Sequence, residues 1–257
     1  MNVLQAVIYG FVEGFTEFLP VSSTAHLIFL SNFLKLPQNE FISFFEVFIQ
    51  SGAILAVVLV YAQYLNKHQK LVMPVLISFV PTAAVGFFAH DIIKTVLFPS
   101  TLIISLSLVA VGVVFLIIEY MVGKKILTLE KNILNITPVE AFIIGLCQAC
   151  AIVPGVSRAG AVIVGMMFLK YKRADAAIYS FLLAVPTIIG ASVLDLIKTD
   201  YSLLTKSNLI IVGVGFVISF VSALLFIKWL IRYLQNNTLV VFGVYRILVG
   251  SILLLLF

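Results

Sequence analysis

The sequence predicts an all-α polytopic membrane protein with six transmembrane helices and two re-entrant helical hairpins, arranged as an inverted-topology repeat. Three observations support this fold class: the composition, two interrupted apolar regions, and the placement of the basic residues. Of 257 residues, 62% are hydrophobic and only 11% are charged, and the mean hydropathy is +1.20. A soluble domain carries roughly 25% charged residues, so there is too little charge to cover a water-facing surface. This composition excludes a soluble enzyme, a disordered chain and a disulfide-framed scaffold.

Six segments are long enough and apolar enough to cross a bilayer as helices. Such a crossing takes about 20 mostly apolar residues. We therefore predict a single integral membrane domain, residues 1–257, with little chain outside the bilayer. The predicted spans cover approximately residues 44–64, 72–90, 101–122, 176–197, 208–229 and 239–257.

Two further apolar regions, 2–35 and 137–170, are interrupted by polar residues and by prolines. Pro20 lies in the first region and Pro154 in the second. Each region is too short for two full crossings joined by a turn. We therefore predict that each region enters the membrane as a helix, breaks and returns to the same side.

The basic residues determine the orientation. The positive-inside rule places basic clusters in the cytoplasm. Six spans and two returning hairpins put all the clusters on one side, with the weakly charged loops near Asp91 and Lys94 and at 198–206 on the other. The first hairpin then enters from outside and the second from the cytoplasm. The four clusters are Lys67 and Lys70; Lys124, Lys125 and Lys131; Lys170, Lys172 and Arg173; and Lys228 and Arg232.

The two halves, approximately 1–122 and 137–257, follow one plan of hairpin, span, span and span in opposite orientations. Inverted repeats of this kind place broken helices and a polar site near the midplane, where the hairpin tips meet. The halves also share a faint sequence similarity, in which Gly10-x-x-Glu13 and Pro20-x-x-Ser23 correspond to Gly145-x-x-Gln148 and Pro154-x-x-Ser157.

Two glutamates of the first hairpin, Glu13 and Glu17, lie four residues apart and so share one face of a helix. Ionisable groups at membrane depth are costly and indicate functional sites by default. Neighbouring carboxylates repel each other unless a proton or a cation relieves the repulsion. Mg²⁺ commonly binds one or two carboxylates together with substrate phosphate oxygens. We therefore predict a divalent cation, Mg²⁺ or Ca²⁺, at Glu13 and Glu17; the alternative is two solvated glutamates at an aqueous helix end.

The segment that follows, Pro20-Val-Ser-Ser-Thr-Ala-His26, places hydroxyls and an imidazole within two helical turns. Ser23 and His26 are three residues apart, and a hydroxyl beside a base is the minimal arrangement for an activated nucleophile. His26 could instead attack phosphorus itself or protonate a leaving oxygen. Ser22 and Thr24 are expected to contact substrate, because a helix that begins here can bind phosphate through its free N–H groups. The plainer interpretation of the hydroxyls is helix capping.

The second hairpin contributes the segment Pro154-Gly-Val-Ser-Arg158. An arginine in an apolar hairpin needs an anionic partner, and its planar fork matches phosphate oxygens. The partner is either a phosphate ligand or the glutamates of the first hairpin, and a permanent Glu–Arg pair that locks the hairpins together is the structural alternative. Gln50 and Gln148 are predicted as substrate contacts, although such residues more often join helices. Arg246, in the last span, is expected to pair internally.

A long motif in the first hairpin resembles the signature of the bacterial undecaprenyl-diphosphate phosphatase family of the bacitracin-resistance type. It reads Val12-Glu-Gly-Phe-Thr-Glu-Phe-Leu-Pro-Val-Ser-Ser-Thr-Ala-His26. The segment 154–158 resembles that family's second signature, and residues 45–58 and 181–190 also look like family segments. The resemblance covers nearly the whole chain in order and spacing.

This resemblance implies an enzyme of the bacterial inner membrane that removes the terminal phosphate of undecaprenyl diphosphate. Such an enzyme regenerates the lipid carrier for peptidoglycan and other cell-wall polymers and confers bacitracin resistance. The resemblance also implies divalent-metal dependence and an active site that faces the outer side. By motif, Glu13 and Glu17 would be metal or acid–base carboxylates, Ser23 and His26 would serve the nucleophilic step, and Ser157 and Arg158 would hold the diphosphate.

Undecaprenyl diphosphate and membrane lipids are the expected partners, no nucleic acid is expected, and a homo-oligomer is left open. The alternative function is a transporter or flippase of a prenyl phosphate or phospholipid, because inverted repeats with broken helices also build transporters. A candidate nucleophile beside two carboxylates favours the enzyme. Whether Ser23, His26 or a water molecule attacks phosphorus is not decided by the sequence.

The second motif departs from the family pattern at two positions. The family usually continues Ser-Arg-Ser-Gly-Ala-Thr, whereas Ala159 and Val162 replace the last two hydroxyl residues here. If those hydroxyls contact phosphate, each lost hydrogen bond to a charged group costs about 1.5–3 kcal/mol. We therefore expect weaker substrate binding, and a higher catalytic efficiency when Ala159→Ser and Val162→Thr restore the hydroxyls.

Overall fold

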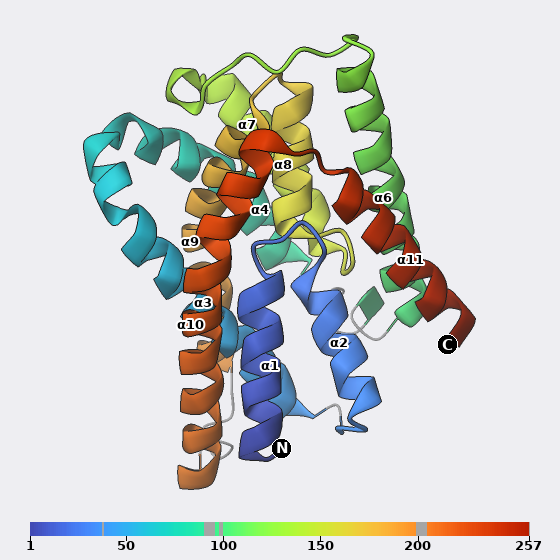
Figure 1. Cartoon of the computed structure of the whole chain (residues 1–257). Coiled ribbons are helices and arrows are strands. Elements are labelled where there is room, and N and C mark those ends of the chain that lie inside the picture. The colour runs from blue at the N-terminus through green and yellow to red at the C-terminus, as the bar shows by residue number, and fades with distance from the viewer. Residues whose placement is uncertain (38, 90–95, 98–99, 199–204, 257) are drawn as a thin grey trace.

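The computed structural model of the chain is a bundle of helices (Figure 1). It describes residues 1–37, 39–89, 96–97, 100–198 and 205–256. In these residues the only β pairing is an isolated parallel bridge between Lys131 and Tyr171. The α-helices are α1 (Val3–Thr16), α2 (Ser23–Phe33), α3 (Glu40–Lys67), α4 (Val72–Phe88), α6 (Thr101–Gly123), α7 (Pro138–Ala149), α8 (Arg158–Phe168), α9 (Arg173–Lys198), α10 (Lys206–Asn236) and α11 (Val240–Leu256), and the short 3-10 turns are η1 (Gln69–Leu71), η3 (Ile133–Asn135) and η4 (Cys150–Ile152).

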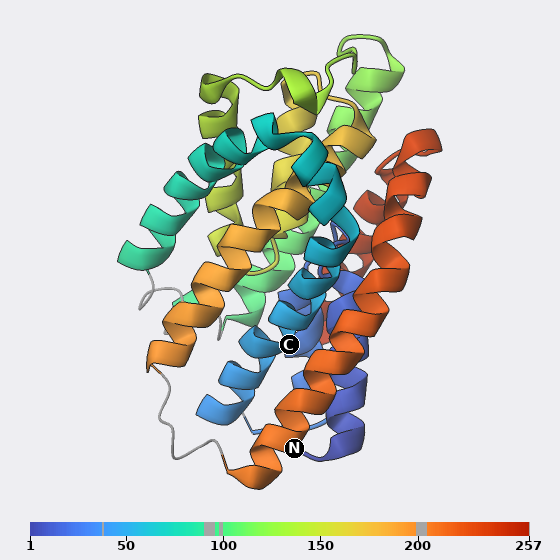
Figure 2. The same ribbon diagram turned by 90° about the vertical axis from the view of Figure 1, so that its left-hand side faces the viewer.

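Five helices are long and apolar enough to cross a membrane: α3, α4 with the preceding η1, α6, α9 and α10. They coincide with five of the predicted spans. The sixth, predicted at 239–257, corresponds to α11, which has 17 residues and belongs with the shorter apolar helices. The predicted loop with Asp91 and Lys94, and most of the loop at 198–206, lie outside the described residues. Figure 2 shows that α10, with 31 residues, runs along nearly the full height of the molecule.

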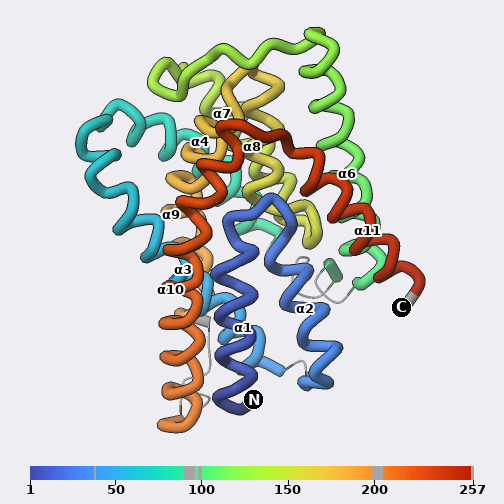
Figure 3. The backbone as a smooth tube through the Cα atoms, in the orientation of Figure 1, coloured from blue at the N-terminus to red at the C-terminus, as the bar shows by residue number. Residues whose placement is uncertain are grey.

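The two interrupted regions each form a pair of short helices joined by a break. The α1–α2 pair and the α7–α8 pair run in from opposite ends of the molecule, and their tips approach each other near mid-height (Figure 3). At both tips a serine caps the second helix with φ in the left-handed region, Ser22 at 71° and Ser157 at 73°. Each serine hydroxyl accepts a hydrogen bond from the backbone N–H three residues on. A non-glycine residue in this region costs about 1–3 kcal/mol, so both breaks are held by their surroundings.

The paired caps give the register between the hairpins. The sequence comparison aligned Ser23 with Ser157, but the structure gives Ser22 the cap geometry of Ser157. Gly10 and Gly145 are separated along the chain by the same number of residues as Ser22 and Ser157, so they also correspond. The same separation also pairs Glu13 with Gln148 and Ser23 with Arg158.

The first helix of each hairpin packs tightly against a long helix from the other end of the chain. A Cβ at Gly10 in α1 would lie 2.5 Å from the carbonyl oxygen of Gly215 in α10. A Cβ at Gly145 in α7 would lie 2.3 Å from the carbonyl oxygen of Ser78 in α4. Glycine at these positions lets helix backbones touch, which is the usual packing of membrane helices. The hairpins are therefore fixed to rigid long helices at corresponding points.

The basic clusters lie at one end of the bundle. The α3–α4 turn, the α6–α7 connection, the α8–α9 turn and the last part of α10 are all in the upper part of Figure 1. Backbone hydrogen bonds join two of these connections directly, because the Lys131 N–H donates to the Lys170 carbonyl at 2.9 Å. The structure thus agrees with the predicted grouping of positive charge.

A buried ion pair fastens this end. Arg173 at the start of α9 pairs through two nitrogens with Glu119 near the end of α6. Glu119 Oε1 also accepts the backbone N–H of Leu239, just before α11, at 2.8 Å. Glu119 thus joins three segments at this end of the bundle.

Candidate active site

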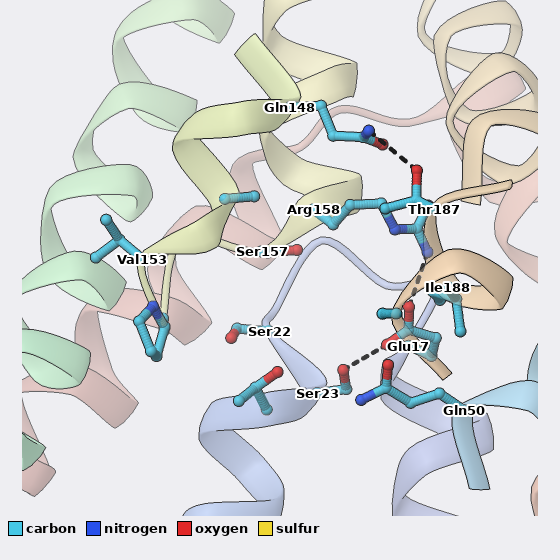
Figure 4. A pocket seen from close by; sticks show the side chains of 15 residues that line it. Glu17, Ser22, Ser23, Gln50, Gln148, Val153, Ser157, Arg158, Thr187 and Ile188 are labelled. Carbon is cyan, nitrogen blue, oxygen red and sulfur yellow. Dashed lines mark hydrogen bonds and ion pairs between the residues drawn. The ribbon is translucent and has the colours of Figure 1, made fainter. Parts of the chain in front are cut away.

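A cavity of about 170 Å³ lies between the two hairpin tips and is bordered by α3 and α9 (Figure 4). It contains most of the predicted site. The backbone breaks at the two tips bring their polar side chains together. In the sequence these two groups of residues are separated by more than half the chain. The predicted residues that line it are Glu17, Ser22, Ser23, Thr24, Gln50, Gln148, Ser157 and Arg158.

Glu17 is at the centre of the site. Its Oε2 accepts a hydrogen bond from the Ser23 hydroxyl at 2.5 Å, and its Oε1 accepts one from Arg158 Nη2 at 2.8 Å. The Arg158 side chain is 12% exposed and that of Glu17 is 7% exposed. Charge-assisted hydrogen bonds of this kind are short and strong. The Glu17–Arg158 pair joins the two hairpins, which was the structural alternative considered for the arginine above. Together with Ser23, the pair also places a hydroxyl, a carboxylate and a guanidinium in contact.

Arg158 is held from two further directions. Its Nη1 donates to the carbonyl oxygen of Ser180 in α9 at 2.7 Å, with the Ser180 hydroxyl at 3.4 Å. The guanidinium carbon lies 5.9 Å from the centroid of the Phe18 ring. Its Nε has no hydrogen-bond partner in the described part of the chain. The guanidinium is thus fixed in place while one buried donor stays unused.

The two glutamines occupy opposite walls of the cavity. Gln148 Nε2 donates to the hydroxyls of Thr82 at 2.8 Å and Thr187 at 3.1 Å. Its Oε1 is buried and has no partner among the described residues. The Gln50 amide points toward Ser23 and Glu17 (Figure 4). Gln148 therefore joins helices, as glutamines at depth commonly do, and both glutamines present amide groups to the site.

Glu13 does not line the cavity. It lies one helical turn before Glu17 in α1, is fully buried, and neither carboxylate oxygen has a hydrogen-bond partner among the described residues. Buried carboxylates without partners are costly, so this one fits a cation or a proton. In the described chain no three acidic, histidine or cysteine side chains form a metal-binding group. The carboxylates of Glu13 and Glu17 alone are too few ligands for an ion. They fit a divalent cation that is also bound by phosphate oxygens of the substrate.

His26 points away from the cavity. Its Nδ1 lies 2.7 Å from the carbonyl oxygen of Ser22, and its Nε2 lies 2.7 Å from the hydroxyl of Tyr245 in α11. The two rings are stacked, with centroids 5.7 Å apart. Both ring nitrogens are engaged, so the Ser23 hydroxyl bonds to Glu17 and not to His26. The expected serine–histidine pair is replaced by a serine–glutamate pair.

Arg246 in α11 joins the tips from outside the cavity. Its guanidinium is fully buried and donates to the carbonyl oxygen of Pro20 in the first tip, and to those of Gly155 and Val156 in the second. It was expected to pair internally, and its partners are backbone carbonyls rather than a carboxylate. The signal in the sequence was a charge within an apolar span, but that signal does not indicate which groups the arginine holds.

The chain is similar to known proteins over nearly its whole length. The family model described as "Bacitracin resistance protein BacA" matches residues 6–252. The chain belongs to the BacA family. A protein of Persephonella marina named undecaprenyl-diphosphatase is 44% identical over 255 residues, 99% of either chain. Similar proteins of the same name come from a Sulfurihydrogenibium species, 44% identical over 97% of either chain, and from Aquifex aeolicus, 38% identical over 98% of this chain and 97% of its own.

Sequence reasoning missed several polar residues in this site and near it. Thr187 in α9 lines the cavity and holds Gln148. Glu46 in α3 accepts a hydrogen bond from Ser31 at 3.1 Å, and Ser31 in turn lies 2.5 Å from the Tyr9 hydroxyl. Glu46 and Thr187 belong to segments that resemble the family, but as single polar residues inside long apolar spans they have no local motif to indicate a role.

The two positions that depart from the BacA-family pattern lie outside the cavity lining. Ala159 and Val162 are buried in α8 and do not contact the described cavity. Val162 packs in the main apolar core. A threonine there would bring a hydroxyl into that core, and valine and threonine are not interchangeable in such places. The hypothesis that the missing hydroxyls are phosphate contacts therefore has no support in this geometry.

Proposed function

We propose that this chain is an integral membrane undecaprenyl-diphosphatase, which hydrolyses undecaprenyl diphosphate to undecaprenyl phosphate and phosphate. The similar proteins described above carry that name. The observation that carries the proposal is the contact of Ser23, Glu17 and Arg158 in one cavity. A hydroxyl bonded to a carboxylate is an activated nucleophile, and the arginine supplies the positive charge that a phosphoryl group requires. The role of this family is recycling of the lipid carrier for cell-wall synthesis.

In the proposed reaction the Ser23 oxygen attacks the terminal phosphorus, and Glu17 takes the hydroxyl proton as general base. The bond from that phosphorus to the bridging oxygen breaks, and undecaprenyl phosphate leaves. Glu17 returns this proton to the leaving bridging oxygen and is a base again. It then deprotonates the water that hydrolyses the phosphoserine and passes that proton to the released Ser23 oxygen, so that one water is consumed and one phosphate is released. Arg158 stabilises the charge that develops on the phosphoryl oxygens.

The N-termini of α2 and α8 support the same substrate. Both helices begin at the cavity, with Ser22 and Ser157 as their caps and with Thr24 in the first turn of α2. Helix N-termini bind phosphate through their N–H groups and their dipole. His26 is then a positioning residue, because its hydrogen bond to the Ser22 carbonyl fixes the start of α2.

A divalent cation, Mg²⁺ or Ca²⁺, belongs to the proposal. Glu13 and Glu17 would hold it, and when bound it would neutralise charge on the diphosphate. The two unpartnered oxygens of Glu13 support this assignment. Activity that survives EDTA treatment in full would refute it, and Glu13→Gln should raise the metal concentration that gives half-maximal activity.

The placement in the bacterial inner membrane is also proposed. With α11 as the sixth span and both hairpins re-entrant, the halves approximately 1–122 and 137–257 form the inverted repeat. The grouping of basic residues at one end supports a cytoplasmic position for that end, so the α1–α2 hairpin and the site open to the outer side. The test is to replace Lys67 or Lys170 by cysteine and to add a thiol reagent that does not cross the membrane. Reaction of either cysteine from outside the cell would overturn this orientation.

The test of the proposed function is phosphate release from undecaprenyl diphosphate by the purified protein in mild detergent. We expect release with Mg²⁺, little with EDTA, and none from Ser23→Ala. A quenched reaction with substrate labelled in the terminal phosphate should leave label on Ser23. If the active wild-type protein carries no label, and Ser23→Ala is still inactive, direct attack by water on phosphorus would be favoured.

The transporter alternative is less favoured. A carrier must bind and release its lipid but has no need of a hydroxyl bonded to a carboxylate beside the bound phosphate. A folded wild type that binds the lipid through Arg158 without releasing phosphate would restore that alternative.

A further inference from the structure

Gln148, in the wall of the candidate active site, holds its side-chain amide in one orientation. Its Nε2 donates to the hydroxyl oxygens of Thr82 at 2.8 Å and Thr187 at 3.1 Å. Thr82 donates its own hydroxyl hydrogen to the carbonyl of Gly145 at 3.3 Å, and Thr187 donates its hydrogen to that of Leu183 at 2.8 Å. Each threonine oxygen can therefore only accept a further hydrogen bond. The amide nitrogen faces both hydroxyls, because a flipped amide would set its oxygen against two acceptors.

This orientation leaves the amide oxygen of Gln148 without a donor. The residue is 1% exposed, and no N–H or O–H group of the described chain bonds to its Oε1. Arg158 lines the same cavity, and its buried Nε has no acceptor among those residues. Buried polar atoms are rarely left unpaired, and bound water commonly pairs those that the protein leaves. An unused acceptor and an unused donor in one cavity wall fit a molecule that both donates and accepts, as water does.

The unpaired oxygen lies across the cavity from the candidate nucleophile. Gln148 and Arg158 belong to the second hairpin and Ser23 to the first, with the cavity between the two tips (Figure 4). In a displacement at phosphorus, the attacking and leaving oxygens lie roughly in line on opposite sides. The bridging oxygen that Ser23 displaces therefore departs toward the second hairpin. The water that later displaces Ser23 arrives from that same side.

Glu17 reaches both sides of the cavity. Its Oε2 accepts from the Ser23 hydroxyl, and its Oε1 accepts from Arg158 of the second hairpin. The base of the proposed reaction thus has one oxygen at the nucleophile and the other where water arrives. Gln148 supplies a different function there, because an amide oxygen accepts a hydrogen bond but does not take up the proton. In other phosphoryl-transfer enzymes a glutamine orients the attacking water.

We propose that Gln148 Oε1 orients the water that hydrolyses the phosphoserine. This inference rests on the proposed function and deepens its second step. In that step the water oxygen forms a bond to phosphorus, and the bond from phosphorus to the Ser23 oxygen breaks. One water proton passes through Glu17 to the Ser23 oxygen, while the other water hydrogen is held by Gln148. The first step, in which Ser23 attacks the diphosphate, involves no water and does not need this contact.

The test follows the two steps separately, with undecaprenyl diphosphate labelled in its terminal phosphate. Gln148→Met keeps a side chain of similar length and removes both polar groups. Gln148→Asn keeps an amide but withdraws its oxygen, and it is the second variant if the methionine variant does not fold. The matched control is Thr82→Val, which removes a hydrogen bond from the same amide but leaves Oε1 in place. Thr82 is not part of the cavity lining.

In both Gln148 variants we expect dephosphorylation, and kcat with it, to fall about 10²-fold, because a misplacement of about 1 Å costs that much. The ratio kcat/KM should stay within about twofold of wild type, since it reports only the steps up to the phosphoserine. Labelled Ser23 should then accumulate in quenched samples. Thr82→Val should lower the unfolding temperature and keep kcat within about twofold. If kcat and kcat/KM fall together and no label accumulates, Gln148 only joins helices and the proposal is overturned.

A measurement without lipid separates this inference from the proposed function. Reversal of the second step forms phosphoserine from inorganic phosphate and releases water, so the wild type should exchange phosphate oxygen with heavy-oxygen water. Gln148→Met should slow this exchange about 10²-fold, because both directions share one transition state, and Thr82→Val should not. A wild type that exchanges oxygen but releases no phosphate from undecaprenyl diphosphate would refute the proposed substrate and keep the role of Gln148. Phosphate release with an exchange rate unaffected by Gln148→Met would refute only that role.

Discussion

The two hairpin tips have the same backbone design but carry different chemistry. Each tip breaks a helix, places a serine in the left-handed region and begins a new helix at the cavity. At corresponding positions the first tip has Ser23 where the second has Arg158, and Glu13 where the second has Gln148. In the proposed reaction the first hairpin supplies the acid–base and nucleophilic groups, and the second supplies a fixed cation and a neutral amide. One structural device serves two roles because the side chain after the cap differs.

The largest expected effect comes from removing the base of the first tip. Glu17→Gln keeps the shape but loses the acceptor that activates Ser23, and general-base catalysis is worth about 10²–10⁴-fold. We expect kcat to fall by that amount in a phosphate-release assay. Glu140→Gln, at the basic end of the bundle, is the matched control and should retain activity within about twofold of wild type. Equal activity of the two variants would show that Ser23 does not depend on Glu17.

The corresponding change in the second tip is Arg158→Lys. A lysine is a point charge and cannot reach both Glu17 and Ser180 in the geometry of the fork. Loss of one preorganised donor costs about 10²–10³-fold in kcat, so we expect an effect slightly below that of the first tip. Arg173→Lys, in the other buried Arg–Glu pair, should lower the unfolding temperature and leave kcat nearly unchanged. The reverse pattern would make Arg158 a structural lock only.

The contact that keeps the tips together can be broken at a residue that does not itself line the cavity. Arg246→Met leaves the carbonyls of Pro20, Gly155 and Val156 without their donor, and a buried acceptor without a partner costs about 1–3 kcal/mol. We expect a clearly lower unfolding temperature in detergent and a loss of activity that Arg246→Lys partly restores. Wild-type stability of the methionine variant would mean that the tips are held by their own helices.

The smallest effect sharpens the comparison of the two caps. Ser22→Gly and Ser157→Gly each remove one cap hydrogen bond but relieve the left-handed strain, so each should change the free energy of unfolding by only about a few tenths of a kcal/mol. The alanine variants keep the strain of the wild type and lose the cap, and should cost about 1 kcal/mol. Thermal unfolding of all four variants checks this. A large difference between the two tips would contradict their equivalence.

Much of the fold was readable in the sequence because the bilayer constrains it. Apolar length indicated six spans, of which five are long helices in the structure. Interrupted apolar runs indicated two broken hairpins, and the lysines indicated which loops share one end of the bundle. The sixth span was the weakest prediction, since α11 is only 17 residues long. Composition does not report whether a short apolar helix crosses the membrane or lies against another helix.

The site was predicted as a set of residues but not as a set of contacts. The sequence by itself identified Glu17, Ser23 and Arg158, because charge and hydroxyl groups at membrane depth are costly and therefore conspicuous. Only the tertiary structure decided that Ser23 bonds to Glu17, that His26 turns to Tyr245, and that Ala159 and Val162 lie outside the cavity. Spacing along one helix gives neighbours on a face, but the direction of each side chain depends on what packs against it.

The groups that assemble the site come from distant helices and carry no motif. Arg246 reaches both tips from the far end of the chain, and Thr187 holds Gln148 from α9. Periodicity and composition report only local preference, whereas these contacts form where the chain returns to the same point in space. The sequence determined a membrane bundle with a charged, broken centre; the packing of the long helices decided which of its polar groups meet.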